Sequence, residues 1–269
     1  MTASNQKVAV HELLTLPRGK VDMWMATCSD IDPALSGRYR DQLLCEEERA
    51  AESTFHFARD RQQYLVTRAL VRCVLSRYSD RLPADWRFGK TAHGRPTILC
   101  PSEEERELSF NISHCAGVVL VAVMNGGQLG IDTESYERGD DFIAIGQRCF
   151  TRGEVSALDC LPPAQRWQQY VRYWTLKEAY VKATGTGLAT VLDSFGFQMP
   201  DVERIECRFN DPASAATDWH FSLLEPTATH VAALCCAGHG ARAPHLLLRR
   251  MRPLVDEHFV DFTLLARSA

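Results

Sequence analysis

The feature that most constrains the fold is a pair of consecutive predicted strands in the middle of the chain. Residues 117–124 form an apolar run of strand length, and a turn at residues 125–127 separates it from residues 129–134. The Asn-Gly-Gly sequence of this turn is typical of a hairpin. In the second strand Asp132 and Glu134 are two positions apart, so their side chains are expected on one face. Two adjacent carboxylates repel each other, and a cation between them relieves that repulsion.

The clearest predicted helix covers residues 165–183 and ends at Gly185. Glu178 and Lys182 share a face of this helix, since they are four residues apart. They form either an ordinary surface ion pair, or a third carboxylate and a phosphate ligand beside the acidic pair. The predicted apolar stripe of the helix consists of Tyr173, Leu176, Tyr180 and Ala183, and Trp174 extends the polar face.

Basic residues occur in two segments before the central strands. A predicted helix over residues 58–78 carries Arg68, Arg72 and Arg77, which we expect to face solvent, as we expect of Glu48 in a preceding polar helix over residues 31–49. Arg59, near the start of the basic helix, is the better candidate for contact with an anion.

Lys90 and Arg95 lie in a turn-forming stretch that contains a glycine. Such loops let the backbone approach a ligand closely, although an ordinary surface turn explains the same pattern.

Polar residues also follow the predicted strand at residues 108–112. Asn111, Ser113 and His114 lie between two apolar strands. A histidine at a strand end is more often structural than catalytic. Its closeness to the Asp132 and Glu134 strand favours a functional role.

Composition indicates an ordinary globular protein. The chain has 269 residues, 45% hydrophobic and 24% charged, which suggests two domains. A net charge of −4 gives no overall attraction for nucleic acid, so an anionic ligand requires a local basic cluster. We expect a cytoplasmic protein without a membrane partner, because no signal peptide or membrane-length apolar run is evident and the ten cysteines show no CxxC spacing.

Further elements are predicted by local patterns. Residues 21–25 alternate as a strand, and Thr151 with Glu154 forms a capping box at the start of a helix. Residues 142–150 are expected to form a short amphipathic helix. Predicted strands at 219–224 and 230–237 echo residues 110–124, which hints at an internal duplication.

Several of these segments occur together in one protein family. In order they are residues 110–114 (FNISH), 130–134 (GIDTE) and 174–182 (WTLKEAYVK), which resemble the signature blocks of the surfactin-type 4′-phosphopantetheinyl transferases. Weaker similarities are found at residues 57–60, 94–96, 149–151 and 193–195, so the resemblance covers about half of the chain. Arg95 stands where the family usually has lysine, and Thr133 where isoleucine is common.

The resemblance implies an α/β (α+β) fold of two similar subdomains related by a pseudo-twofold axis, with the active-site cleft between them. The expected division is an N-terminal half at residues 1–127, a C-terminal half carrying the acids at 128–248, and an extension at 249–269. A monomer is implied.

The resemblance also implies a reaction: transfer of 4′-phosphopantetheine from coenzyme A to a serine of an acyl or peptidyl carrier protein. Asp132, Glu134 and Glu178 would hold Mg²⁺ against the diphosphate, a set of hard oxygen ligands that suits this ion. Glu178 would act as the base, directly or through water, with Asp132 and Lys182 completing the catalytic group. Coenzyme A would contact Arg59, Lys90, Arg95, Asn111, Ser113, His114 and Lys182.

Two other functions are compatible with parts of this pattern. A Mg²⁺-dependent phosphohydrolase would use the same three acids without a protein acceptor. A non-catalytic module that binds coenzyme A or a carrier protein would not need all three acids. The carrier itself is not specified, since fatty-acid, polyketide and peptide carriers are all compatible with the sequence.

Overall fold

The structure is a computed structural model that describes residues 12–137, 149–187, 190–201, 203–238 and 242–268. The expected helix at residues 142–150 lies almost entirely outside these ranges. The longer helices are α1 (Pro33–Gln42), α2 (Glu46–Ser53), α3 (Ala58–Leu75), α5 (Arg152–Cys160) and α6 (Pro163–Thr184), with a short α7 (Pro212–Ala215). The strands are β1 (Lys20–Thr27), β2 (Phe88–Lys90), β3 (Pro96–Ile98), β4 (Leu108–Cys115), β5 (Val118–Asn125), β6 (Gln128–Ser135), β7 (Phe195–Asp201), β8 (Arg204–Phe209), β9 (His220–Thr227), β10 (His230–Ala237), β11 (His245–Arg252), β12 (Asp256–Phe259) and β13 (Thr263–Arg267).

Two large sheets repeat one topology. The first sheet has the order β12-β11-β1-β5-β4, and the second has the order β6-β10-β9-β13-β8-β7. In each half a first strand leads into helices and then into a hairpin, whose second strand pairs antiparallel with the first: β1 with β5, and β6 with β10. This arrangement confirms the two similar subdomains and the duplication that the strands at 219–237 suggested.

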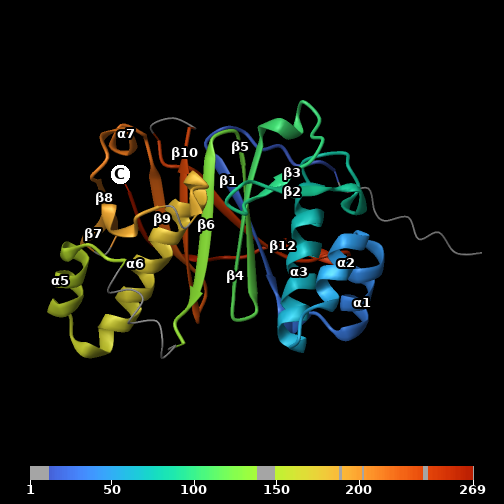
Figure 1. The fold of residues 1–269 in the computed structure, drawn as a ribbon, viewed down its shortest axis with the longest axis horizontal. Coiled ribbons are helices and arrows are strands. Elements are labelled where there is room, and N and C mark those ends of the chain that lie inside the picture. The colour runs from blue at the N-terminus through green and yellow to red at the C-terminus, as the bar shows by residue number, and fades with distance from the viewer. Residues whose placement is uncertain (1–11, 138–148, 188–189, 202, 239–241, 269) are drawn as a thin grey trace, which may run out of the picture.

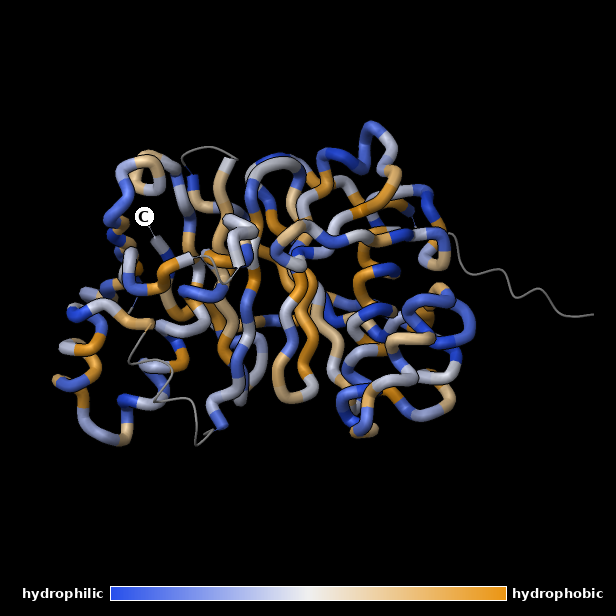
Figure 2. Tube along the Cα trace, in the orientation of Figure 1, coloured by the Kyte–Doolittle hydropathy of each residue, from blue (hydrophilic) through white to orange (hydrophobic). Residues whose placement is uncertain are grey.

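The sheets lie between two helical layers, with α1 to α3 on one side and α5 and α6 on the other (Figure 1). Hydrophobic residues concentrate along the central strands (Figure 2). β5 explains why, because its side chains alternate between two cores and both of its faces are buried. Val119, Val121 and Val123 pack in the core with α3, whereas Val118, Leu120, Ala122 and Met124 pack in a core shared with the second sheet.

The turn after β5 does not form the expected hairpin, because it carries the chain from one sheet to the other. Both neighbouring positions of β5 are already taken by β1 and β4, so β6 cannot pair with it and instead starts the second sheet. Gly126 and Gly127 have φ values of 71° and 78°, which glycine adopts without strain.

The C-terminal region joins both halves. β11 pairs parallel with β1 in the first sheet, whereas β13 pairs with β9 in the second. Short strands β7 and β8 complete the second sheet. The division into residues 1–127, 128–248 and 249–269 stays a prediction.

Two expectations about charged residues were wrong. The helix expected over residues 31–49 breaks into α1 and α2, and Glu48 on α2 is buried rather than exposed. The Arg77 side chain is only 11% exposed and pairs with Glu257. Arg72 is fully buried, and Arg68 is only 17% exposed at its side chain. Both guanidinium groups pair with the Glu48 carboxylate, which compensates for removing the three charges from water.

β6 and α6 pack very closely against each other at Gly130. A Cβ atom at Gly130 would lie 2.1 Å from the carbonyl oxygen of Ala179 and 2.4 Å from the amide nitrogen of Ala183. Both are backbone atoms of α6 and cannot rotate away. Gly130 is therefore required for this contact.

We expect Gly130→Ala to lower the free energy of unfolding by about 3 kcal/mol, because the helix must move off the strand. Gly37→Ala in α1 is the control, since nothing lies within 4 Å of the added Cβ and alanine favours a helix by about 0.5–1 kcal/mol. Urea unfolding followed by circular dichroism measures both. An unchanged midpoint for Gly130→Ala would contradict the tight contact.

Candidate active site

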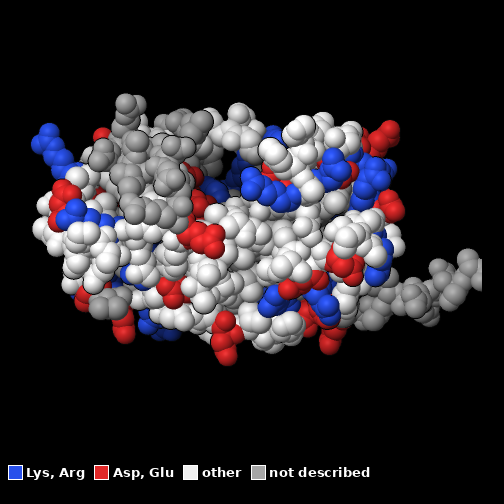
Figure 3. All heavy atoms as spheres, turned by 90° about the horizontal axis from the view of Figure 1, so that it is seen from below, with Lys and Arg blue, Asp and Glu red and all other residues white. Residues whose placement is uncertain are grey.

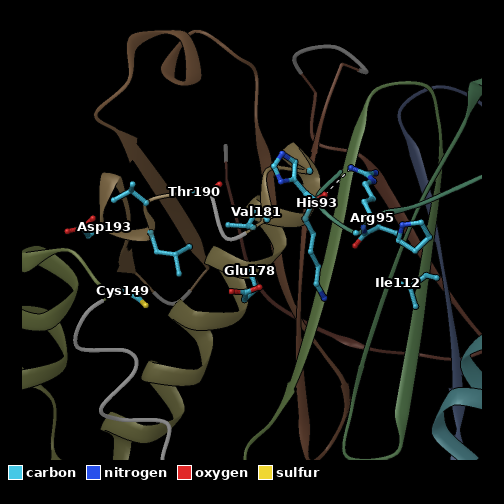
Figure 4. Close-up of a pocket in the computed structure, with 16 residues that line it drawn as sticks. His93, Arg95, Ile112, Cys149, Glu178, Val181, Thr190 and Asp193 are labelled. Atoms are coloured by element: carbon cyan, nitrogen blue, oxygen red, sulfur yellow. Dashed lines mark hydrogen bonds between the residues drawn. The ribbon is translucent and has the colours of Figure 1, made fainter. Parts of the chain in front are cut away.

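A cleft between the two halves contains most of the predicted site residues. It consists of two adjoining cavities of about 540 and 800 Å³, which share Pro96, Ile112, Glu178 and Lys182 as lining residues. Figure 3 shows a hollow near the middle of the lower face, with basic and acidic side chains close together beside it. In Figure 4, Glu178 lies between Cys149 and Asp193 on one side and Arg95 and Ile112 on the other.

The three predicted acids all line the larger cavity. Asp132 and Glu134 lie on one face of β6, as their spacing predicted, and Glu178 reaches the same cavity from α6. Trp174 and Lys182, one turn before and one turn after Glu178, also line it. The close contact at Gly130 is what brings this face of the helix over the strand.

Burial and the charge of Asp132 raise the pKa values of Glu134 and Glu178. Burial, followed by the charge of Asp132, raises the pKa of Glu134 to about 7. The same two causes raise the pKa of Glu178, although the Lys182 ammonium opposes the shift. Glu178 is therefore a better proton acceptor near neutral pH than an ordinary glutamate.

Lys182 already neutralises one acid. Its Nζ lies 2.7 Å from Oδ1 of Asp132 and 2.9 Å from Oγ of Ser113. The second carboxylate oxygen of Asp132, Oδ2, is buried and has no hydrogen-bond partner in the described part of the chain. A buried anionic oxygen without a donor is the kind of atom that a cation satisfies.

The donor set suits a hard divalent cation, which prefers carboxylate oxygens. In the described ranges, however, no three histidine, cysteine, aspartate or glutamate side chains are close enough together to hold a metal as they stand.

Asn111 and Ser113 connect the two halves at this point. β4 and β6 lie side by side in different sheets, and side chains take the place of backbone pairing. The Ile131 amide donates to Oδ1 of Asn111 at 2.9 Å, and the Thr133 amide donates to Oγ of Ser113 at 3.2 Å. Ser113 in turn donates to Oδ1 of Asp132 at 3.0 Å. Both side chains thus fix the acidic strand in position.

Arg95 reaches across the cleft. Its Nη1 donates to the carbonyl oxygens of Lys182 and Ala183 at 2.9 and 3.1 Å, near the C-terminus of α6. Its Nη2 donates to the carbonyl oxygens of Phe110 and Leu129 at 3.4 and 3.0 Å. A planar guanidinium group can bridge these four carbonyls, whereas a lysine ammonium has three donors around one atom.

His114 lines the larger cavity, and its Nδ1 lies 2.9 Å from Nε2 of Gln63 on α3. Partial desolvation in the cleft and the nearby Lys182 ammonium lower its pKa. Gln63 and Arg68, which also lines this cavity, were not predicted as site residues. Their spacing shows only that they are on the polar side of α3, and it does not indicate that this side of the helix borders the cleft.

The remaining two predicted cations lie outside both cavities. The Arg59 side chain is 85% exposed and pairs with Asp60. Asp60 itself lines the larger cavity. Lys90 is exposed on β2 and is not among the lining residues. Their predicted contacts with coenzyme A stay a prediction.

A buried ion pair supports one wall of the smaller cavity. Lys177, next to Glu178 on α6, and Glu154, at the start of α5, have fully buried side chains 3.1 Å apart. Lys177 also donates to the carbonyl oxygens of Leu192 and Phe195, each at 2.7 Å. The sequence did hold a signal for this pair, because a lysine four residues after Tyr173 lies within the apolar stripe of the helix.

We expect Lys177→Met to lower the free energy of unfolding by about 3–5 kcal/mol, since it leaves the buried Glu154 without its cation. The double variant Glu154→Gln, Lys177→Met should lose clearly less than the sum of the two single changes. Gln168→Met, at an exposed position of α6, serves as the control. Urea titration measures all of them, and a single-variant loss under about 1 kcal/mol would rule out a structural role for the pair.

A pH dependence follows from the raised pKa of Glu134. The folded state keeps the Glu134 proton up to about pH 7, whereas the unfolded chain loses it near pH 4.5. The contribution of this proton to the free energy of unfolding is therefore complete below pH 4.5 and is lost as the pH rises through 7. In chelator-treated protein, the wild type should lose about 3 kcal/mol of its free energy of unfolding across this interval, and Glu134→Gln should not show this loss. Urea midpoints from pH 4.5 to 8 test it, with the exposed Glu103→Gln as control. A variant that keeps the wild-type slope would contradict the assignment.

Comparison with known proteins shows the family of the chain. Two family models match successive parts of the chain: "4′-phosphopantetheinyl transferase, N-terminal" over residues 24–125 and "4′-phosphopantetheinyl transferase superfamily" over residues 128–235. The 4′-phosphopantetheinyl transferase HetI of Nostoc sp. (strain PCC 7120) is 32% identical over 229 residues, which cover 84% of this chain and 92% of that protein. The phosphopantetheinyl transferase of Thraustochytrium sp. is 26% identical over 87% of this chain and 86% of its own.

The surfactin type is represented by the 4′-phosphopantetheinyl transferase Sfp of Bacillus subtilis (strain 168), which is 27% identical over 64% of this chain and 73% of its own. Among solved structures, the Thermotoga maritima holo-[acyl-carrier-protein] synthase aligns with 42% of this chain and 64% of its own, at 21% identity and a TM-score of 0.33. The chain belongs to the surfactin-type 4′-phosphopantetheinyl transferase family.

Proposed function

We propose that this chain transfers the 4′-phosphopantetheine group of coenzyme A to a serine hydroxyl of an apo carrier protein, with Asp132, Glu134 and Glu178 as the acids of the active site. The observation that carries the proposal is that these acids, from β6 and α6, line one cavity between the two halves together with Lys182. Family membership gives the reaction, and the site supports the residues.

The cleft is suited to an extended anionic ligand. Its two adjoining cavities join at Glu178 and Lys182, so one ligand can occupy both. Basic side chains line each part: Arg95 and Lys182 the smaller cavity, and Arg68 and Lys182 the larger. They place basic groups along the whole cleft, although acidic side chains outnumber them in the larger cavity.

A divalent cation, Mg²⁺ by donor type, is part of the proposal. Four acidic side chains line the larger cavity against two basic ones, so the cavity on its own repels a diphosphate: Asp60, Asp132, Glu134 and Glu178 against Arg68 and Lys182. Asp132, whose Oδ2 lacks a donor, would hold the ion with Glu134 and Glu178. When bound, the ion would neutralise the diphosphate and polarise its phosphorus–oxygen bonds.

The residues of the chain account for the proton and the leaving group. The serine oxygen of the carrier forms a bond to the β-phosphorus while its proton passes to the Glu178 carboxylate, whose raised pKa favours acceptance. The bond from this phosphorus to the oxygen that bridges the two phosphates breaks. Adenosine 3′,5′-bisphosphate leaves with the electron pair, and Lys182 offsets the new charge on it.

The chain acts as a monomer, and its partners are coenzyme A and a carrier protein of the acyl or peptidyl type. No helix in the described ranges is long and apolar enough to cross a membrane. All ten cysteines lie in the described part of the chain and are free thiols.

Mass spectrometry of an apo carrier protein incubated with the chain, coenzyme A and Mg²⁺ tests the proposal. We expect the carrier to gain one phosphopantetheine group, and Glu178→Gln to slow the reaction at least about 100-fold. Removal of the metal by a chelator should stop the reaction, and added Mg²⁺ should restore it.

Glu103→Gln, an exposed acid outside the cleft, should react at the wild-type rate. Release of adenosine 3′,5′-bisphosphate from coenzyme A without a carrier would indicate a phosphohydrolase instead. Coenzyme A binding without any turnover would indicate a binding module.

A further inference from the structure

The side chain of Gln63 connects α3 to the end of β4 and to the turn that follows it. Its Oε1 accepts a hydrogen bond from the Gly117 backbone amide at 3.2 Å, in the turn between β4 and β5. Its Nε2 lies 2.9 Å from Nδ1 of His114 at the end of β4. The amide therefore has a separate partner on each side.

The Gly117 contact fixes the direction of both hydrogen bonds. A backbone N–H can only donate, so the Gln63 atom facing it must be the carbonyl oxygen. The other end of the amide is then the NH₂ group, which can only donate to His114. Nδ1 of His114 must accept this bond through its lone pair, and the proton of the neutral ring is on Nε2.

Nε2 is therefore the ring nitrogen left for a ligand in the larger cavity, which His114 lines with Asp132, Glu178 and Lys182. A protonated Nε2 donates to an anionic oxygen and has no lone pair with which to accept a proton. Partial desolvation and the nearby Lys182 ammonium oppose a second proton on the ring more strongly than the Asp132 carboxylate favours one. His114 is thus prepared for a hydrogen bond to a phosphate oxygen.

We infer that Gln63 is a positioning residue, which holds His114 as a neutral Nε2–H donor toward a phosphate oxygen of coenzyme A and prevents it from acting as the base. This inference rests on the proposed function. It leaves Glu178 as the group that takes the serine proton. The hydrogen bonds of Gln63 carry it, and neither depends on a bound metal.

Nitrogen-15 NMR of the histidine rings, recorded on the full chain without coenzyme A, tests the tautomer directly. For His114 at neutral pH we expect an unprotonated Nδ1 and a protonated Nε2. In Gln63→Glu the new carboxylate can still accept from Gly117 but offers His114 no donor, so Nδ1 should become protonated. A protonated Nδ1 in the wild type, or an unchanged ring in Gln63→Glu, would overturn the inference.

Steady-state kinetics test whether the arrangement matters for the substrate. Gln63→Leu should raise the KM for coenzyme A about threefold to tenfold, with less change in kcat, because the ring loses the partner that orients it. Gln168→Leu is the control: Gln168 is exposed on α6 and lines neither cavity, so this variant should leave the KM for coenzyme A unchanged.

A double-mutant cycle separates action through His114 from a general effect on the fold. In a His114→Ala background, Gln63→Leu should cause no further rise in KM. An additive rise would mean that Gln63 acts through Gly117 or the helix, and would overturn the inference. The NMR result is independent of turnover, so a wild-type chain that does not modify carrier proteins would contradict the proposed function and leave this test intact.

Discussion

The active site depends on the contact between β6 and α6. Because Gly130 has no side chain, the backbone of the helix lies directly on the strand at Ala179 and Ala183. Glu178 and Lys182, each next to one of these residues, therefore stand over the acidic face of β6. The absence of a side chain at Gly130 thus allows β6 and α6, almost fifty residues apart in sequence, to place their charged side chains close to each other.

The second half alone does not complete the site. Asn111 and Ser113 of the first half bind the backbone of β6, and Arg95 binds carbonyl oxygens of both halves and of α6. These are side-chain contacts across a gap where the sheets do not pair. They fix the position of Asp132 relative to Lys182. Asn111, Ser113 and Arg95, which were predicted to contact the ligand, therefore also have a structural role.

Much of the fold could be predicted from sequence because burial leaves periodic patterns. The stripe of α6, the acidic face of β6 and the repeated strands all follow from periods of 3.6 or 2 residues. Failures occurred where a distant partner decides the outcome. Glu48 and Arg72 look solvated in sequence, and only the folded chain places them together. β11 joins the first sheet through pairing with β1, more than 200 residues earlier in the chain, which local patterns do not encode.

We propose that acids from β6 and α6 hold one divalent cation against the diphosphate of coenzyme A. A crystal structure of the chain with coenzyme A and Mn²⁺, measured near the manganese absorption edge, tests it directly. We expect one anomalous peak within coordination distance of the Asp132 and Glu178 carboxylates and of both phosphates. A diphosphate bound away from β6, or a manganese ion that does not contact Asp132, would contradict it.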